Sequence, residues 1–284
     1  MNTYCGRLFS DSEVTQLRQL LANNPEYNRA ELSRQVCRMI GWHKADGGLK
    51  EMSCRVAMLR MHADGLIRLP PPARTKPALR PISFTPATDP QDPIVQPVHN
   101  LGPIRLCAVE RADSALWNEY IQRYHYLGYT PLPGAQIRYS VLLDQQVIAL
   151  LGFGAAAWQA APRDQYVGWN HAQRKLHLPQ VVNNARFLIL PWIQVKNLAS
   201  KILAMAVKQV PQDWHKLYNI KPVLMETFVE TGRFAGTCYK AANWAHVGAT
   251  KGRGKLGPAG QQSVPIKELW LYPLDSDLRK ILTA

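Results

Sequence analysis

Prolines divide this chain into pieces that have to fold separately. The segment over residues 70–103 opens on three consecutive prolines, and more follow at Pro77, Pro81, Pro86, Pro90, Pro93 and Pro97. Because proline lacks a backbone N–H and fixes φ, this spacing excludes helix and favours an extended chain. We therefore expect a small domain over 1–69, a proline-rich linker over 70–103 and a larger domain over 104–284. Apolar side chains between the prolines leave a second interpretation, in which the segment lies in grooves of the larger domain.

The larger domain alternates strand and helix patterns. They predict a strand at 104–109, a helix at 112–124 and a hairpin of 138–143 with 147–153. Further along, an apolar run ends at Pro191 and a helical period begins near Leu198. A β-rich run at 223–229 then leads through a turn at Gly236 into residues 239–244. The order strand, helix, strand, short helix, strand predicts a mixed α/β domain.

This order resembles the second half of the fold of the GNAT N-acyltransferases, over roughly residues 105–250. Residues 197–203 lie where those enzymes carry a glycine-rich turn that holds acyl-CoA, and residues 239–248 lie where they carry a tyrosine in a short helix and then a strand. The resemblance departs at the turn, because residues 194–199 contain no glycine. A pyrophosphate needs bare backbone N–H groups there. The resemblance thus implies a GNAT-like sheet and leaves the cofactor unknown.

The amino-acid sequences of several segments also resemble those of the DruA family of Druantia anti-phage defence systems. They are Arg186–Pro191, Asn197–Ser200, Glu226–Glu230, Gly236–Trp244 and Gly248–Gly254. Members of this family also occur beside mobile elements. The resemblance implies bacterial antiviral defence or mobile-element DNA work, with other defence subunits as partners. It supplies no catalytic mechanism, so whether the protein is an enzyme stays open.

The charge balance favours a polyanionic partner. The chain has 34 Lys and Arg against 20 Asp and Glu, and residues 104–284 carry 21 and 11 of these, a net +10. Such an excess binds phosphates by releasing counterions, although it also suits a merely soluble basic surface. The candidate contacts to double- or single-stranded DNA in the larger domain are Arg186, Lys196, Lys201, Lys240, Lys251, Arg253 and Lys255, with Tyr126, Tyr239 or Trp244 stacking on bases.

The small domain is predicted to contain three helices and a strand. A capping box at Ser10–Glu13 starts the first helix, 29–40 form the second, 50–64 the third, and 65–69 a short strand. This order is typical of a winged helix, whose third helix enters the major groove with Lys50 and Arg55 outward. Its inward face would carry Met52, Val56, Leu59 and Ala63. The alternative is a helical partner-binding module.

Three side chains are candidates for chemistry. Glu226 interrupts an apolar strand pattern, so its carboxyl has either a raised pKa or a cationic partner, for which Arg186, Lys240 and His125 are the nearest candidates. A buried ion pair that only fixes the sheet is the alternative. His125 lies in an aromatic loop, where it either moves a proton or packs. Tyr239 is implied by the GNAT resemblance.

Three hypotheses for function follow. The first is a DNA-binding component of defence or of a mobile element. The second is an acyltransferase-fold enzyme that modifies nucleic acid or protein. The third is a magnesium-dependent nuclease or recombination factor that uses Glu226 and Glu230.

The five cysteines are not within ligand spacing of one another, which indicates reduced thiols in the cytoplasm and no structural zinc. The apolar run at 147–158 is too short, and too broken by glycine, to cross a membrane.

Overall fold

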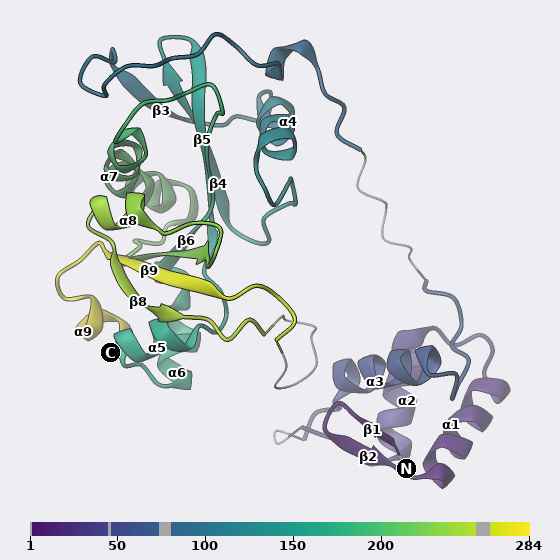
Figure 1. The fold of residues 1–284 in the computed structure, drawn as a ribbon. Coiled ribbons are helices and arrows are strands. Elements are labelled where there is room, and N and C mark those ends of the chain that lie inside the picture. Colours follow the sequence, from purple (N-terminus) through teal and green to yellow (C-terminus); the bar gives the residue numbers. More distant parts are fainter. Residues whose placement is uncertain (1, 45–46, 74–80, 254–261) are drawn as a thin grey trace. The chain divides into compact units, whose positions relative to one another are not determined.

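The computed structural model describes residues 2–44, 47–73, 81–253 and 262–284. The chain forms two compact units, Met1–Arg80 and Pro81–Ala284 (Figure 1). Each unit has its own buried apolar cluster. In the described part of the chain, no helix combines the length and the apolar character that crossing a bilayer requires.

The first unit begins with a hairpin and continues with three helices. Its elements are β1 (Asn2–Tyr4), β2 (Arg7–Phe9), α1 (Asp11–Asn23), α2 (Arg29–Met39) and α3 (Glu51–Ala63). The capping box is confirmed: Glu13 N–H donates to Ser10 Oγ at 3.1 Å, and Ser10 N–H donates to the Glu13 carboxylate at 3.0 Å. The three helices fall where the sequence predicts them.

Two details of the first unit were predicted wrongly. The buried face of α3 consists of Cys54, Ala57, Met58 and Met61, whereas Met52 is 66% exposed. Both stripes of this helix are apolar, so the helical period could not choose between them. Residues 65–69 form no strand, because β1 and β2 pair with each other and Ile67 and Leu69 instead pack into the core. The winged-helix architecture stays a prediction.

The second unit is built on one seven-stranded sheet in the order β3-β4-β5-β6-β7-β9-β8. The strands are β3 (Ile104–Ala108), β4 (Gln136–Leu143), β5 (Gln146–Ala155), β6 (Val181–Ile189), β7 (Leu224–Glu230), β8 (Ala245–Ala249) and β9 (Lys267–Pro273). The β6–β7 pair is parallel and the other pairs are antiparallel. The helical connection between β6 and β7 accounts for the parallel pair, since a hairpin cannot join parallel strands.

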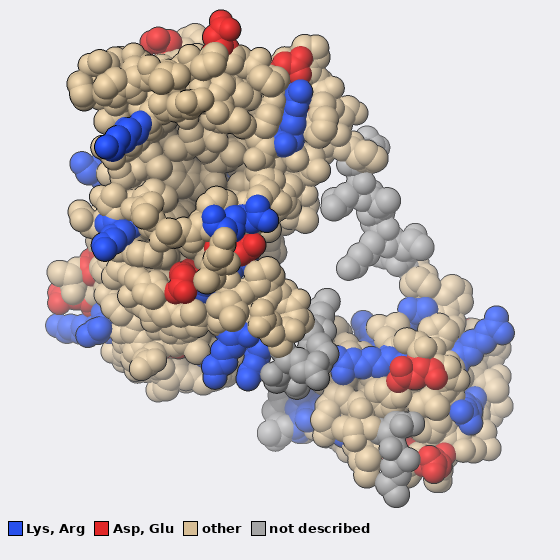
Figure 2. Space-filling model, in the orientation of Figure 1, with Lys and Arg blue, Asp and Glu red and all other residues tan. Residues whose placement is uncertain are grey.

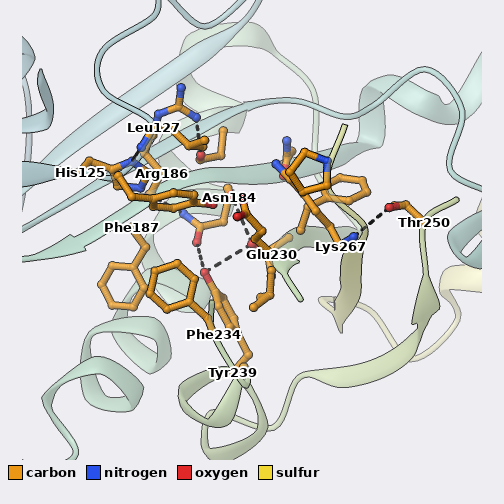
Figure 3. A pocket seen from close by; sticks show the side chains of 18 of the residues that line it. His125, Leu127, Asn184, Arg186, Phe187, Glu230, Phe234, Tyr239, Thr250 and Lys267 are labelled. Atoms are coloured by element: carbon orange, nitrogen blue, oxygen red, sulfur yellow. Dashed lines mark hydrogen bonds between the residues drawn. The ribbon is translucent and has the colours of Figure 1, made fainter. Parts of the chain in front are cut away.

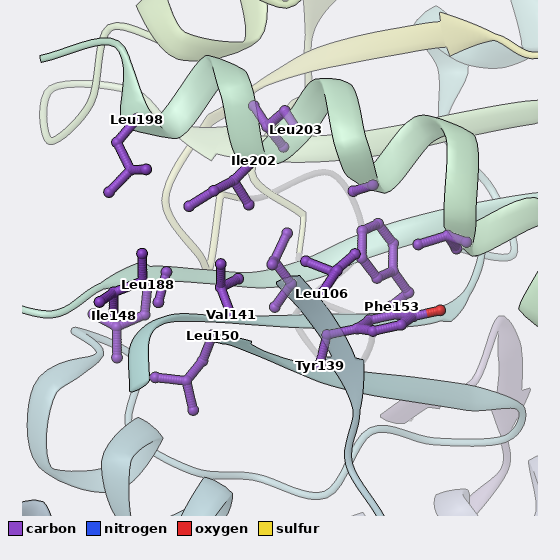
Figure 4. Close-up of a cluster of buried hydrophobic side chains, with 14 of the residues drawn as sticks. Leu106, Tyr139, Val141, Ile148, Leu150, Phe153, Leu188, Leu198, Ile202 and Leu203 are labelled. Atoms are coloured by element: carbon purple, nitrogen blue, oxygen red, sulfur yellow. The ribbon is translucent and has the colours of Figure 1, made fainter. Parts of the chain in front are cut away.

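Helices cover both faces of this sheet (Figure 1). They are α4 (Ser114–Tyr124), α5 (Ala161–Val167), α6 (His171–His177), α7 (Leu198–Tyr218), α8 (Thr237–Ala241) and α9 (Leu278–Leu282), with 3-10 turns at Pro86–Thr88 and Leu178–Gln180. Residues of α7 such as Ile202 and Leu203 pack on strand residues that include Val141 and Leu106 (Figure 4). The order β6, α7, β7, α8, β8 is the GNAT-like order that the sequence predicts.

The β7 side chains alternate between two buried clusters. Met225 and Val229 join the cluster that includes α7, whereas Leu224 and Phe228 join the cluster around α5 and α9. A strand buried on both faces needs apolar residues on both, which explains why its sequence is almost continuously apolar. Glu226 and Thr227 are buried polar exceptions, and their surroundings are described below.

The proline-rich segment beyond Pro81 lies on the second unit. Ile94 forms a parallel bridge with Ile193: its N–H donates to Trp192 O, and its carbonyl accepts from Gln194 N–H, both at 2.9 Å. Nearby, Thr85 and Thr88 donate to the buried Glu119 carboxylate. The segment thus adds a short extended piece to the loop between β6 and α7, as in the second of the two interpretations.

Candidate functional site

A pocket of about 880 Å³ opens where β6 and β7 separate (Figure 3). The two strands pair only from Val181 to Asn184 and from Leu224 to Thr227. Beyond these positions β6 follows β5 and β7 follows β9, so side chains rather than backbone bonds fill the gap. The pocket is lined by 183–187 of β6, 227–230 of β7, the loop 125–127, the segment 234–239 and parts of 250–253 and 264–267.

A bulge in β6 sets the direction of two lining side chains. Asn183 lies opposite Gly154 of β5 and Arg186 lies opposite Gly152, although one extra residue separates them on β6. Residues opposite each other in an antiparallel pair share a face, so the bulge brings Asn183 and Arg186 to the same face of the sheet. A Cβ at Gly152 would lie 3.3 Å from the Arg186 Cβ, and glycine leaves this room free.

Arg186 and Asn183 carry polar atoms without partners. The Arg186 guanidinium donates to Ala185 O at 2.8 Å and to Thr130 Oγ1 at 3.0 Å, but its Nε is buried and unbonded. Asn183 Oδ1 is likewise buried and unbonded. Among the described residues no carboxylate forms an ion pair with Arg186, and burial lowers the pKa of its guanidinium. Unpaired buried groups cost free energy that a ligand can recover.

The pocket has an excess of positive charge. Arg186, Arg253 and Lys267 line it together with one carboxylate, Glu230, which contacts Arg233 at 3.4 Å. Cations gathered in a hollow with low-dielectric walls focus their field on it. An anionic ligand is therefore the kind that this lining favours.

A buried hydrogen-bond network closes the inner end of the pocket. Tyr239 Oη donates to Asn184 Oδ1 at 2.8 Å, and Thr227 Oγ1 donates to Asn184 O at 3.0 Å (Figure 3). The Asn184 amide donates back to Arg186 O at 3.0 Å. Burial raises the pKa of Tyr239, so its hydroxyl keeps its proton at neutral pH. Tyr239 contacts the pocket and at the same time ties β6 to α8.

His125 stands at the end of α4 and faces the same pocket. Its Nδ1 accepts from Leu127 N–H at 3.2 Å, which leaves the hydrogen of the neutral ring on Nε2. Burial, with a smaller contribution from the charges of Arg186 and Lys267, lowers the pKa of His125 to about 4. The imidazole is thus neutral at physiological pH and is available as a hydrogen-bonding group rather than a cation.

The mouth of the pocket is aromatic. The rings of Tyr126 and Phe234 meet edge to face with centroids 5.2 Å apart, and they are 37% and 51% exposed. The Arg233 guanidinium lies 4.9 Å from the centre of the Tyr126 ring. Sequence reasoning missed Phe234, Asn183 and Lys267 as site residues. Only Phe234 gave a signal, as an apolar residue isolated in a turn between two glycines.

Glu226 lies outside this pocket in a buried ion pair. Its carboxylate accepts from the Arg163 guanidinium at 2.9 Å and from Ala157 N–H at 2.8 Å, and both charged side chains are fully buried. Burial raises the pKa of Glu226, and the charge of Arg163 opposes that shift. The expectation that Arg186, Lys240 or His125 pairs with Glu226 was therefore wrong. Its partner Arg163 comes from α5, a helix that the sequence pattern did not predict. The geometry is that of the structural alternative.

The remaining predicted DNA contacts are spread over the second unit. Trp244 is only 4% exposed and packs between Tyr239 and Tyr272, so the expectation that it stacks on a base was wrong. Lys201 lines a second hollow of about 620 Å³ beside α7 and α8. Of the predicted contacts, Lys196, Lys240 and Lys251 are exposed and line neither hollow. Lys255 lies outside the described residues. In the first unit, Lys50 and Arg55 are half-buried.

Figure 2 shows blue side chains scattered over the visible face of the second unit rather than joined into one patch. Within the described ranges no cluster of three or more His, Cys, Asp or Glu side chains is placed to hold a metal ion.

Comparison with known proteins assigns the family. Residues 62–261 match the family model of the Druantia protein DruA. The chain belongs to the DruA family. No curated protein matches it.

Solved structures that resemble the second unit are acetyltransferases. A mutant of the spermidine N-acetyltransferase SpeG from Vibrio cholerae shares 14% identity, with 62% of this chain and 95% of that chain covered and a TM-score of 0.40. An N-acetyltransferase from Staphylococcus aureus shares 10% identity, with 61% and 99% covered and a TM-score of 0.38. The aminoglycoside acetyltransferase AAC(6')-Ib with coenzyme A shares 14% identity, with 63% and 98% covered and a TM-score of 0.41. Because these TM-scores are low, the GNAT-like architecture is inferred from the strand order of the sheet and not from these structures.

The two arginines at 163 and 186 are predicted to affect stability in opposite ways. Arg163→Met leaves the fully buried Glu226 unpaired and should lower the free energy of unfolding by about 3–5 kcal/mol. Arg186→Met removes a cation that pairs with no carboxylate in the described part of the chain, and it should leave the free energy of unfolding unchanged or raise it. Urea denaturation followed by tryptophan fluorescence compares the two. An equal loss in both variants would show that Arg186 is needed for packing.

The depressed pKa of His125 predicts a pH effect on stability. Above pH 6.5 the imidazole is neutral in the folded and the unfolded chain. As pH falls from 6.5 towards 4, the unfolded chain takes up a proton that the folded chain does not, so stability is lost across this window. His125→Gln should lose less stability there. The measurement is the urea midpoint of both proteins at several pH values, and parallel curves would contradict it.

Proposed function

We propose that this DruA-family protein is a DNA-binding component of a bacterial defence system or mobile element, and that its second unit contacts DNA phosphates around the pocket between β6 and β7. The observation that carries the proposal is the half-buried Arg186, which has no carboxylate partner among the described residues and shares its pocket with Arg253 and Lys267. The net charge of +14 supports it. Other defence subunits are expected partners, and a cytoplasmic location stays a prediction.

The chain beside the pocket is arranged to present cations. Gly252 has a φ of +62°, and a Cβ there would lie 2.6 Å from Val264 O. The Gly252 carbonyl accepts from Val264 N–H at 3.0 Å, so the loop is closed at this glycine. Lys251 and Arg253, on either side of it, are exposed. The guanidinium and ammonium groups on either side of Gly252 can contact phosphates of the DNA backbone without recognising the base sequence.

The first unit supplies a weaker case for DNA contact. Lys50 and Arg55 are half-buried, and the outward face of α3 includes the apolar Met52 and Leu59. A recognition helix needs polar groups that reach base edges or phosphates. We therefore place the main DNA contact on the second unit.

The acyltransferase alternative is disfavoured by the loop before α7. In an acyl-CoA enzyme the N–H groups of this loop face the pyrophosphate. Here Ile193 N–H donates to Leu190 O, Gln194 N–H to Ile94 O and Leu198 N–H to Val195 O. The proline-rich segment thus occupies one N–H group of this loop, that of Gln194.

The nuclease alternative required Glu226 and Glu230 to act as a pair. Glu226 uses its carboxylate on Arg163 and Ala157, and Glu230 contacts Arg233. Two carboxylates committed to cations are poor ligands for magnesium, which favours free carboxylate oxygens.

The salt dependence of DNA binding tests the proposal. We expect log affinity to fall linearly with log salt, and replacing Lys251 and Arg253 by alanine should reduce the slope by about two phosphate contacts. A matched control replaces Lys175 and Lys216, which are exposed and line neither hollow. Fluorescence anisotropy with labelled DNA measures both. Equal slopes in the two double variants would remove the loop from the interface, and no binding to any DNA would overturn the proposal.

Coenzyme A is expected not to bind. A ligand at a hundredfold its dissociation constant stabilises a protein by about 2.7 kcal/mol, which a thermal melt detects easily. We predict no change in melting temperature with saturating CoA or acetyl-CoA. A clear upward shift would move the acyltransferase hypothesis to first place.

A further inference from the structure

The pocket between β6 and β7 contains features that phosphate binding alone does not require. Its mouth is formed by the exposed aromatic rings of Tyr126 and Phe234. Inside lies Asn183, whose Oδ1 is buried and unbonded. A phosphate neither stacks on an aromatic ring nor, when ionised, donates a hydrogen bond to an amide oxygen. The ligand that fits this lining therefore has a planar ring and hydrogen-bond donors as well as negative charge.

We infer that this pocket receives one unpaired nucleotide of a DNA strand, with its base stacked at Tyr126 and Phe234 and its phosphate held by Arg186 and Lys267. The inference rests on the proposed function, because it names the part of DNA that enters the site.

The aromatic mouth suits a base in shape and exposure. Tyr126 and Phe234 contact each other edge to face, which leaves part of each ring free for a third ring. Every base has a π face, so such a platform accepts a base without selecting its identity. The Arg233 guanidinium beside Tyr126 adds a second planar group at the same place. The volume of about 880 Å³ lies within the range of pockets that enclose small organic ligands.

The interior supplies the polar complement. An amide pairs with a base edge through one donor and one acceptor, and Asn183 offers this pair on the wall of β6. The bulge that turns Asn183 and Arg186 to one face places an amide and a guanidinium on the same wall of the pocket, so one can bind the base and the other its phosphate. Lys267 comes from β9, the strand that pairs with β7, and adds a further cation.

A paired base cannot make these contacts. Its two faces are stacked on neighbouring bases and cannot stack on Tyr126 and Phe234, and the polar groups lie inside the pocket between β6 and β7. A nucleotide must therefore leave the helix, at a cost that is least for a mismatched, damaged or already unpaired base. The pocket thus predicts a preference for DNA with such a position over uniform duplex.

Binding to two DNAs tests the inference with the full chain. One is a fully paired duplex and the other is the same duplex with a single unpaired nucleotide. We expect the second to bind roughly tenfold more tightly, which is the scale of one base stacked on an aromatic side chain. Phe234→Ala and, separately, Asn183→Ala should abolish this preference, measured as the ratio of the two affinities of the same variant.

The matched control is Phe84→Ala. Phe84 is 56% exposed, close to the 51% of Phe234, but it does not line the pocket. This variant should keep the preference. Photocrosslinking from iodouracil at the unpaired position should label Tyr126 or Phe234 in the unmodified protein.

The outcomes separate the two proposals. Equal affinity for both DNAs, with crosslinks away from Tyr126 and Phe234, would overturn the nucleotide pocket and leave DNA binding intact. Failure to bind either DNA would overturn the proposed function itself. Competition by a free mononucleotide as strong as that by the unpaired DNA would overturn the strand as the source of the ligand.

Discussion

The Asn184 side chain holds the second unit at the place where its two central strands part. Its Oδ1 accepts from Tyr239 and its amide donates to Arg186 O, while its backbone carbonyl accepts from Thr227. These bonds join β6, β7 and α8 at Asn184 and Thr227, the last residues at which the two strands pair. Parallel strands that separate leave backbone groups without partners, and a buried side-chain network satisfies them without closing the gap. The pocket exists because this network fixes its inner end.

Arg163 and Arg186 differ in whether a carboxylate neutralises their positive charge. Near α5, Arg163 is fully buried and is neutralised by Glu226 and Asp164. In the pocket, Arg186 is half-buried, and no carboxylate among the residues that the structure describes forms an ion pair with it. An unpaired cation in a partly desolvated hollow is unfavourable for folding and is retained where a ligand supplies the missing charge. The contrast separates the Arg163–Glu226 ion pair, which stabilises the fold, from Arg186, the cation that we propose contacts DNA.

A GNAT-like sheet does not commit this protein to acyl transfer. The fold provides the diverging strands, but the proline-rich segment adds a short parallel bridge to the loop in which an acyltransferase would grip its cofactor. The same sheet can thus offer its hollow to another ligand, since function depends on the groups that line a site and not on the architecture around it. Here the lining combines cations, aromatic rings and an unpaired amide.

The sequence by itself determined the family, the α/β order and the helix at Ser10, because periodicity, capping and shared segments are local properties of the chain. It also identified His125, Arg186 and Tyr239, which the fold brings to one pocket. Only the tertiary structure decided that Arg163 pairs with Glu226, that Trp244 is buried, and that Asn183 and Phe234 belong to the site. These facts depend on contacts between residues far apart in the chain and on a one-residue bulge that changes the direction of a side chain, and neither leaves a periodic signal in the sequence.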